Sequence, residues 1–405
     1  MLRCQSVALA SLVLLLVGAD WPQFLGPNRN GISGETGLRA TWPKSGPPRL
    51  WPRSVGAGFS GPVVVGDRLI LFHRLDDREV VECLNANTGK TIWTSSDATA
   101  YHDDFGFDEG PRSTPVVAKG RVYTLGAEGV LRCLTLDTGK QVWRRSLNTD
   151  YHVRKGFFGV ATSPIVEGDL VLVNVGGKGA GIVALNKDTG REVWKATDDG
   201  ASYSSPSAAT INGVRHVFFF TRQGLVSVDP ATGKVHFRKF WRSRMDASVN
   251  AATPVIVGDT VFISACYGTG AALLRVHADA VDDIWTSQEA MSNHYGTCVY
   301  RDGHLYGFDG RQESGAQLRC IELKTGKVCW TKEDFGCGSL ILADGRLIIL
   351  TENGDLVAVD ATPKAYHELA RATILGKPCR AAIALANGRL YARDGKTLAC
   401  WDLKQ

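Results

Sequence analysis

The chain has 405 residues, of which 44% are hydrophobic and 21% are charged, and its formal net charge is +5. These values are ordinary for a globular protein. Lysine and arginine are spread along the chain, and the short basic segment 241–244 is interpreted as a solvated loop. The sequence therefore gives no indication of nucleic-acid binding.

Residues 1–19 are predicted to be a removable signal peptide. Arg3 gives a basic start, residues 7–17 form an apolar run with one serine, and small residues precede Asp20. The run is too short to span a bilayer, and the small residues suit a signal peptidase. An apolar tail that anchors the chain in a membrane is the alternative. No later segment is apolar enough for a transmembrane helix, so we expect a protein exported to the periplasm or the cell exterior.

Turn signals recur along the rest of the chain at nearly constant spacing. Each is centred on a glycine between two short apolar runs, and successive glycines are 42 to 54 residues apart. The eight glycines are Gly66, Gly120, Gly168, Gly213, Gly258, Gly303, Gly345 and Gly388. Such turns supply the positive φ angles of tight β-hairpins, and this repeat length is typical of β-propellers. We predict an all-β, eight-bladed β-propeller with four-stranded antiparallel blades, and seven blades are the alternative. A leader, residues 20–48, precedes this single domain, residues 49–405.

A second motif runs in phase with the first. It combines a small residue, an aliphatic residue, Thr-Gly-Lys or Thr-Gly-Arg, and an aromatic residue three positions further on. Complete copies end at Trp93, Trp143, Trp194, Phe237 and Trp330, and a degenerate copy ends at Trp285. The glycine is expected to turn the third strand of a blade into the fourth. The aromatic ring is expected to pack between neighbouring sheets, where it buries a large apolar area.

The last blade is predicted to be closed by a strand from the N-terminal part of the chain. This blade stops after its third strand near residues 399–402, and residues 50–55 carry Trp51 where a fourth strand would have its aromatic residue. Pairing of the two segments would remove an open sheet edge. We therefore expect Trp51 to lie beside residues 391–401.

Ten cysteines would suggest disulfides in an exported protein. Four of them share one slot of the repeat, namely Cys83, Cys133, Cys320 and Cys400. Other blades place Ala or Ser in this slot, so it requires a small buried side chain, and free cysteine behaves as a small hydrophobe. The best remaining disulfide candidate is Cys337 with Cys379, because both lie at the start of innermost strands in adjacent blades.

The repeat A-x-D-x-x-T-G-K-x-x-W and the Thr-Pro-Val openings of the blades resemble the pyrroloquinoline-quinone-like (PQQ-like) propeller family. The resemblance covers residues 50–405. Residues 20–31, D-W-P-Q-F-L-G-P-N-R-N-G, are similar to the leader of a secreted bacterial branch in which the repeat serves as a scaffold. The same propeller is used by BamB, the accessory lipoprotein of outer-membrane barrel assembly, and by quinoprotein alcohol and glucose dehydrogenases. The motif consists of turn and packing residues, so the resemblance implies a fold and not a function.

A quinoprotein dehydrogenase is expected to need more than this repeat. Similarity to that family would require adjacent cysteines over the cofactor, a carboxylate base and oxygen ligands for calcium. The sequence has no adjacent cysteines and no identifiable set of this kind, and its blades are compact. We therefore expect no cofactor, and PQQ with calcium is the alternative. The assembly role of BamB is an analogy of fold, because its lipid-attachment cysteine has no counterpart here.

Ligands of propellers usually meet loops at one mouth of the central channel. The richest loop before an innermost strand, residues 102–112, holds four carboxylates, two aromatic residues and an arginine. The candidate ligand-binding residues are Asp108, Glu109, Arg112, His152, Tyr203, Asn250, His294, Tyr295 and Arg380. They predict a polar and aromatic lining for a peptide strand or a sugar, with Arg112 placed to anchor an anion. A solvated loop with an internal arginine–carboxylate pair, and histidines with a structural role, are the alternatives.

The sequence contains no Ser-His-Asp arrangement, zinc-type spacing or phosphate loop, so no catalytic or metal-binding residue is assigned. We expect an exported, non-catalytic propeller that binds a protein or peptide at the channel mouth or, by strand addition, at a blade edge. The alternative is a PQQ-dependent quinoprotein oxidoreductase of alcohols or sugars. Clustered carboxylates around a flat, tryptophan-floored cavity would favour that alternative. A mouth lined with uncharged or aromatic groups would favour the binding protein.

Overall fold

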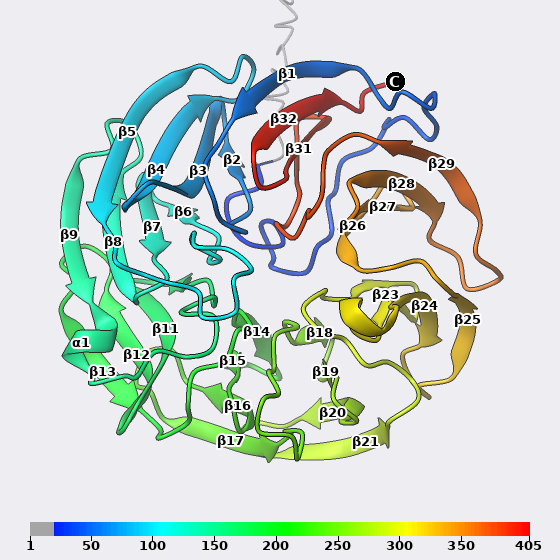
Figure 1. Cartoon of the computed structure of the whole chain (residues 1–405). Helices are drawn as coiled ribbons and strands as arrows, with labels where there is room; N and C mark the ends of the chain where they lie inside the picture. Colours follow the sequence, from blue (N-terminus) through cyan, green and yellow to red (C-terminus); the bar gives the residue numbers. More distant parts are fainter. Residues whose placement is uncertain (1–19) are drawn as a thin grey trace, which may run out of the picture.

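The computed structural model describes residues 20–405, and the predicted signal peptide, residues 1–19, lies outside the described residues. The strands form eight four-stranded antiparallel sheets, which stand as blades around a central axis (Figure 1). The predicted eight-bladed propeller is confirmed, and the seven-bladed alternative is wrong. Within residues 20–405, no helix has the length and apolar character needed to cross a membrane.

The first four blades follow the chain from the innermost strand to the outermost. Blade one contains β2 (Val63–Val65), β3 (Arg68–Leu75), β4 (Arg78–Asn85) and β5 (Thr91–Ala98). Blade two contains β6 (Val116–Ala118), β7 (Arg121–Leu125), β8 (Val130–Thr135) and β9 (Gln141–Ser146), followed by the short helix α1 (Leu147–Asp150). Blade three contains β10 (Ile165–Glu167), β11 (Leu170–Gly177), β12 (Ala180–Asn186) and β13 (Glu192–Ala196). Blade four contains β14 (Ser207–Ile211), β15 (Val214–Phe220), β16 (Gly224–Val228) and β17 (Val235–Phe240).

The remaining blades repeat this order until the last, which takes its outermost strand from the N-terminal part. Blade five contains β18 (Val255–Val257), β19 (Thr260–Ala265), β20 (Gly270–Val276) and β21 (Val281–Ser287). Blade six contains β22 (Val299–Arg301), β23 (His304–Asp309), the 3₁₀ helix η1 (Gln312–Ser314), β24 (Gln317–Glu322) and β25 (Val328–Lys332). Blade seven contains β26 (Gly338–Ala343), β27 (Arg346–Thr351), β28 (Asp355–Asp360) and β29 (Glu368–Thr373). Blade eight contains β30 (Ala384–Ala386), β31 (Arg389–Arg393), β32 (Thr397–Asp402) and β1 (Arg49–Ser54).

Strand β1 closes the ring by pairing with β32, and the two strands lie side by side in blue and red (Figure 1). Trp51 stands opposite Cys400 in this antiparallel ladder. Its ring centroid is 6.1 Å from that of Tyr391. The predicted position of Trp51 is therefore confirmed, and the pairing leaves blade eight with the same four strands as the others.

Tight turns fix which face of the ring each loop occupies. Val65 pairs with Arg68 around a turn in which Gly66 has a φ of 59°. Asn, Asp and Gly tolerate positive φ, which is what such short hairpins require. Because the chain reverses at every turn, the first-to-second strand turns lie on one face. The second-to-third strand connections lie on the opposite face, together with the loops that enter each blade.

Where the next blade carries a Thr-Gly turn, the tryptophan packs on its glycine, as with Trp51 on Gly89, Trp93 on Gly139, Trp143 on Gly190, Trp194 on Gly233 and Trp285 on Gly326. Trp93 donates its Nε1–H to the Leu136 carbonyl at 2.8 Å. A Cβ on Gly139, which follows Leu136 by three positions, would lie only 2.3 Å from the Trp93 ring. Trp143 and Gly190 repeat this arrangement in the next pair of blades. The glycine therefore does more than turn the chain, because its missing side chain makes room for the neighbouring ring.

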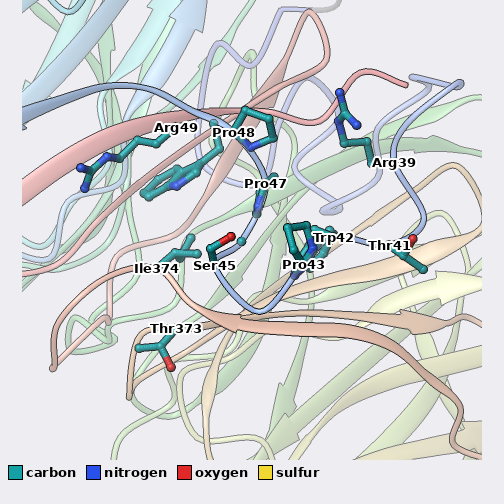
Figure 2. Close-up of a pocket in the computed structure, with 12 residues that line it drawn as sticks. Arg39, Thr41, Trp42, Pro43, Ser45, Pro47, Pro48, Arg49, Thr373 and Ile374 are labelled. Carbon is teal, nitrogen blue, oxygen red and sulfur yellow. The ribbon is translucent and has the colours of Figure 1, made fainter.

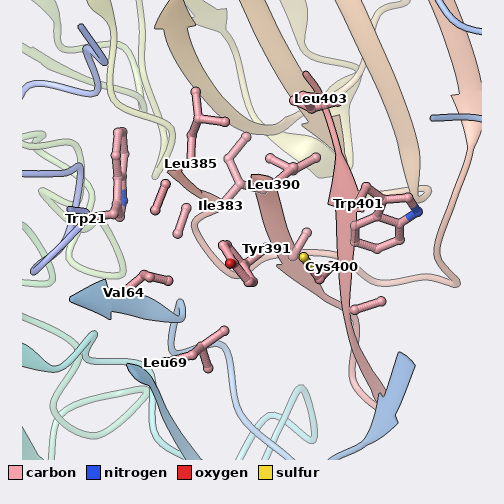
Figure 3. Packing of buried hydrophobic residues seen from close by; sticks show 14 of the residues in the cluster. Trp21, Val64, Leu69, Ile383, Leu385, Leu390, Tyr391, Cys400, Trp401 and Leu403 are labelled. Carbon is pink, nitrogen blue, oxygen red and sulfur yellow. The ribbon is translucent and has the colours of Figure 1, made fainter. Parts of the chain in front are cut away.

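The leader, residues 20–48, runs inward and connects distant blades. Trp21 forms an antiparallel bridge with Val64, and Ile32 forms a parallel bridge with Leu342. Trp21 is buried in a cluster with residues of the first, seventh and eighth blades, several of which Figure 3 shows around it. The leader thus contributes to the core at the junction where the ring closes.

Arg29 of the leader lies buried near the axis. Its Nε donates to the Pro206 carbonyl at 2.7 Å, and its Nη1 donates to the Pro164 carbonyl at 2.9 Å. Burial lowers the pKa of Arg29 to about 9, and the charge of Glu167 partly offsets this effect. The guanidinium therefore ties the leader to the innermost strands of the third and fourth blades.

The candidate disulfide between Cys337 and Cys379 is not formed, because both residues are free, buried thiols. The backbone of Glu352 lies between them. Its N–H donates to the Cys337 carbonyl, and its carbonyl accepts from the Cys379 N–H, each at 2.9 Å. Hydrogen-bonded chain segments lie about 4.7–4.9 Å apart, and two of these spacings separate Cys337 from Cys379. That distance exceeds the Cα separation of about 4.4–6.8 Å that a disulfide tolerates.

Candidate functional site

A cavity of about 410 Å³ lies at the channel mouth on the face that carries the blade-entry loops. Its walls come from the leader, these entry loops, and the second-to-third strand connections of blades five and six. The lining residues are Phe24, Phe59, Phe105, Phe107, Arg112, Thr114, Phe157, Phe158, Ala161, Ser163, Tyr203, Ser205, Ala247, Val249, Ala251, Tyr267, His294, Tyr295, Arg311, Gln312, Glu313, Arg380 and Ala382. We call this space the mouth cavity.

Aromatic rings from three loops form one side of the mouth cavity. The Phe158 ring centroid lies 5.1 Å from that of Phe105, 5.8 Å from that of Phe107 and 5.7 Å from that of Tyr203. Phe105 is 53% exposed, and Phe157 beside it is 39% exposed. Exposed aromatic groups that gather in this way are typical of interaction surfaces.

Asp103 organises the loop that carries Phe105 and Phe107. Its carboxylate is buried and accepts hydrogen bonds at 3.0 Å from the N–H groups of Phe107 and Asp108 and from Arg112. Burial opposes its charge, but the loop N–H groups and Arg112 outweigh that effect and lower the pKa of Asp103. The Arg112 guanidinium also lies 5.8 Å from the Phe158 ring. The internal arginine–carboxylate pair thus shapes the rim of the cavity.

Arg380 lies beside this aromatic side, over two aromatic rings. Its Cζ lies 5.2 Å from the centroid of Phe107 and 5.5 Å from that of Phe59. Its Nε donates to Glu352 at 2.8 Å, and the Tyr295 hydroxyl donates to the same carboxylate oxygen at 2.6 Å. Cation–π contact and the ion pair together hold the guanidinium in place.

Tyr267 and His294 form a hydrogen-bonded chain in the same cavity. The Tyr267 hydroxyl lies 2.9 Å from His294 Nε2, and His294 Nδ1 lies 2.6 Å from Gln312 Oε1. Since an amide oxygen only accepts, Nδ1 carries the proton and Nε2 accepts from the tyrosine. Burial lowers the pKa of His294, which favours the neutral ring. Arg311 lies over the Tyr267 ring at 4.6 Å and pairs with Glu313 at 3.1 Å.

The backbone at Tyr267 adopts a conformation that bulky residues avoid. Its φ is 65°, in the left-handed region, where a large side chain crowds its own backbone. Strained residues of this kind persist where the surrounding structure holds them, and they gather at ligand-binding sites. With this backbone conformation, the phenol ring lies beside the Arg311 guanidinium and lines the mouth cavity.

Five of the nine predicted site residues lie together in the mouth cavity. These are Arg112, Tyr203, His294, Tyr295 and Arg380. They come from blade-entry loops far apart in the sequence, which the ring brings to one face.

The other four predicted residues do not line the mouth cavity. The Asn250 side chain is buried and donates to the Thr221 carbonyl at 2.9 Å, so it fixes neighbouring loops. His152 is exposed and lines a separate cavity beside the mouth. Asp108 accepts a hydrogen bond from within its own loop, and Glu109 forms ion pairs beside it. These two carboxylates bind groups in and beside their own loop and do not line the mouth cavity.

Sequence reasoning missed Tyr267 and Arg311 because it considered only the loops that enter each blade. Both residues lie in connections between second and third strands, which share the face of the entry loops. The connection at residues 310–316 is longer than its counterparts in the other blades. Successive strands of a blade run in opposite directions, so this connection lies on the face of the entry loops. Its extra length is the sequence signal that could have identified Arg311 as a site residue.

The residues of the mouth cavity do not fit a calcium-bound quinone. Calcium takes six to eight oxygen ligands, commonly with several carboxylates. Glu313 is the one carboxylate on the cavity wall, and it is paired with Arg311. Across residues 20–405, no three or more His, Cys, Asp or Glu side chains gather to form a metal site. The described lining also includes no tryptophan on which a flat cofactor could stack.

A second cavity, of about 610 Å³, lies away from the predicted site on the outer flank of the ring. Figure 2 shows the turn at residues 41–48 facing Thr373 and Ile374 at the end of β29. Two donors in its wall, Arg39 Nε and Trp42 Nε1, are buried and lack a partner within residues 20–405. Neither atom reaches solvent, so neither is available to a ligand in this conformation.

The fold and the repeats define a propeller with PQQ-like blades. Residues 76–332 match the family model described as "Outer membrane protein assembly factor BamB". Because this match covers more than half of the chain, the chain belongs to this family of propellers. No curated protein matches the chain.

Solved structures share the architecture at low sequence identity. BamB from Moraxella catarrhalis has a TM-score of 0.62 and 15% identity, covering 88% of this chain and 98% of its own. Quinohemoprotein alcohol dehydrogenase from Comamonas testosteroni has a TM-score of 0.55 and 16% identity, covering 95% of this chain and 81% of its own. The designed protein Ika8 has a TM-score of 0.56 and 11% identity, covering 88% of this chain and 100% of its own. At such identities these likenesses show a shared fold alone.

Proposed function

We propose that the chain is an exported, non-catalytic binding propeller whose mouth cavity receives a segment of a protein or peptide. The observation that carries the proposal is the lining of the cavity, where aromatic rings and guanidinium groups converge and a single carboxylate is present. Concave sites with an apolar lining and a few oriented polar groups are typical of ligand binding. This lining is the kind that we expect of a binding protein.

The rim favours a peptide over a fully enclosed small molecule. Phe105 and Phe157 extend from the cavity into solvent, so they offer contact area beyond the cavity itself. A peptide can place one side chain inside and lay its neighbours against these rings. Aromatic and arginine residues are also the side chains that contribute most to binding at protein interfaces.

Membership of a family named for outer-membrane protein assembly supports a role in protein binding. The predicted signal peptide and the leader resemblance support export to the periplasm or the cell exterior. The alternative, a PQQ-dependent oxidoreductase, would need cofactor contacts that the mouth cavity does not supply. We therefore propose that the protein works without a cofactor.

A peptide-display selection on the mature chain, residues 20–405, tests this function. We expect enriched peptides to bind saturably and to lose about tenfold or more in affinity, about 1.4 kcal/mol, when Phe105 is changed to Ala. Phe240→Ala is the matched control, because Phe240 is 73% exposed on β17, outside the cavity. Equal losses in the two variants would contradict the proposal. So would saturable binding of PQQ with calcium accompanied by dye-linked oxidation of an alcohol or sugar.

A further inference from the structure

Two arginines of the mouth cavity keep part of their hydrogen-bonding capacity unused. Arg380 donates only its Nε, to Glu352, and Arg311 donates only its Nε, to Glu313. The terminal Nη atoms of both side chains have no hydrogen-bond partner within residues 20–405. Because both side chains line the cavity, these N–H groups are available to an occupant.

Aromatic rings lie directly beside both sets of free donors. Phe107 lies 5.2 Å from the Arg380 guanidinium, and Tyr267 lies 4.6 Å from that of Arg311. Stacking on a ring fixes the plane of a guanidinium and leaves its edge free for a bidentate contact. An occupant beside either arginine therefore meets an aromatic ring and free N–H donors together.

The groups that face the cavity favour an anion through their N–H donors, since the three guanidiniums are each paired with a carboxylate, namely Asp103, Glu313 and Glu352. The wall carries three arginines, including Arg112, and one carboxylate, Glu313. Glu352 lies behind Arg380 and is already bound by Arg380 and by the Tyr295 hydroxyl. No described carboxylate on the wall is left to attract a cation.

We infer that the mouth cavity selects an occupant in which an aromatic or large aliphatic group carries an anionic group. Arg380 and Arg311 bind the anionic group through their Nη–H donors. The apolar group packs against Phe107 and the adjacent aromatic rings. This inference rests on the proposed function, since it names the chemistry of the segment that the cavity receives. Charge-assisted, bidentate arginine contacts are the strong and specific ones for carboxylate groups.

Two fluorescent dyes with the same ring systems distinguish the contribution of the anionic group to affinity from that of the apolar rings. Anilinonaphthalene sulfonate carries an anionic group, and N-phenylnaphthylamine has the same ring systems without it. We expect the mature protein to bind the sulfonate about tenfold more tightly than the neutral dye. Equal affinities would overturn the inference and leave the proposed function standing. If neither dye binds, both the inference and the proposed function are contradicted.

Variants assign the effect to the two arginines. Arg380→Gln and Arg311→Gln are each expected to weaken sulfonate binding about tenfold and to change neutral-dye binding less than twofold. Arg191→Gln is the control, because Arg191 is exposed on a turn away from the cavity. Phe107→Ala is expected to weaken both dyes. Equal loss of both dyes in the arginine variants would overturn the inference, since it would indicate disrupted packing.

Displacement of the bound sulfonate dye then distinguishes the source of the anion. Indole acetate represents a free aromatic acid, and acetyl-Trp-Glu-amide represents the same chemistry within a peptide. We expect the peptide to displace the dye and acetyl-Trp-Gln-amide to do so at least several-fold less well. Displacement by indole acetate alone would support the anionic class and contradict the peptide source. Displacement by none of these compounds would overturn the inference.

Discussion

The packing of a tryptophan on the glycine of the next blade leads to a quantitative prediction. Gly139 has a φ of 68°, and a Cβ built there would lie 2.3 Å from the Trp93 ring. Gly120 of the same blade has a φ of 73°, and a Cβ there would meet nothing within 4 Å. The two substitutions Gly139→Ala and Gly120→Ala therefore share the same backbone strain and differ in the contact.

The magnitude follows from these contacts. An alanine at either position costs about 1–2 kcal/mol for the left-handed backbone. At Gly139 the Trp93 ring must also move, which adds about 1–3 kcal/mol of overpacking and about 1 kcal/mol for its hydrogen bond to Leu136. The backbone strain cancels in the comparison. We therefore expect Gly139→Ala to be less stable than Gly120→Ala by about 2–4 kcal/mol.

Urea denaturation followed by tryptophan fluorescence and circular dichroism measures this difference. Both variants and the wild type are compared at one pH and temperature, and the free energies of unfolding are obtained by linear extrapolation. Equal destabilisation by the two substitutions would refute the reasoning. It would show that the glycine in the Thr-Gly turn is needed for its φ angle and not for the neighbouring ring.

Two further predictions concern buried charges. Arg29→Met is expected to destabilise the protein by about 2–4 kcal/mol in urea denaturation, because it leaves the Pro164 and Pro206 carbonyls without donors; a loss below about 0.5 kcal/mol would contradict the role of Arg29. Burial is the main factor that raises the pKa of Glu79 from 4.5 to about 7. Its folded-state pKa is raised, so its contribution is fully present below about pH 4.5 and is lost as the pH rises to about 7. Relative to Glu79→Gln, the wild type should therefore lose roughly 3 kcal/mol between pH 4.5 and pH 8, and parallel pH profiles of the two proteins would contradict this.

Much of the fold could be predicted because its signals are local and repeated. A glycine at positive φ fixes a hairpin within a few residues, and eight such turns, seven of them with Asp or Asn beside the glycine, indicate eight blades. Closure by β1 could also be predicted, because the last blade lacked a strand and Trp51 occupied the matching position. These inferences needed no knowledge of contacts between distant segments.

The path of the leader could not be predicted in the same way. Residues 20–48 do not repeat, and their partners are backbone groups of the inner strands, which carry no sequence signal. The candidate pairing of Cys337 with Cys379 fails for a related reason. Adjacent blades were expected to place the two thiols in contact, but Glu352 inserts its backbone between them.

The candidate site was accessible from the sequence only in part. The entry loops could be identified, so Arg112 and Arg380 were found. Tyr267 and Arg311 lie in second-to-third strand connections, and their place in the mouth cavity depends on how the ring curves. The carboxylates of the loop at residues 102–112 were expected at the mouth, whereas Asp103 turns inward to hold the loop.

The measurement that tests the central claim most directly is a displacement titration at the mouth cavity. The mature protein is loaded with anilinonaphthalene sulfonate and titrated with a peptide obtained by display selection. We predict that the peptide releases the dye at one equivalent, and that Phe105→Ala weakens peptide binding while Phe240→Ala does not. A peptide that binds saturably and leaves the dye in place would show that the binding surface lies elsewhere on the propeller.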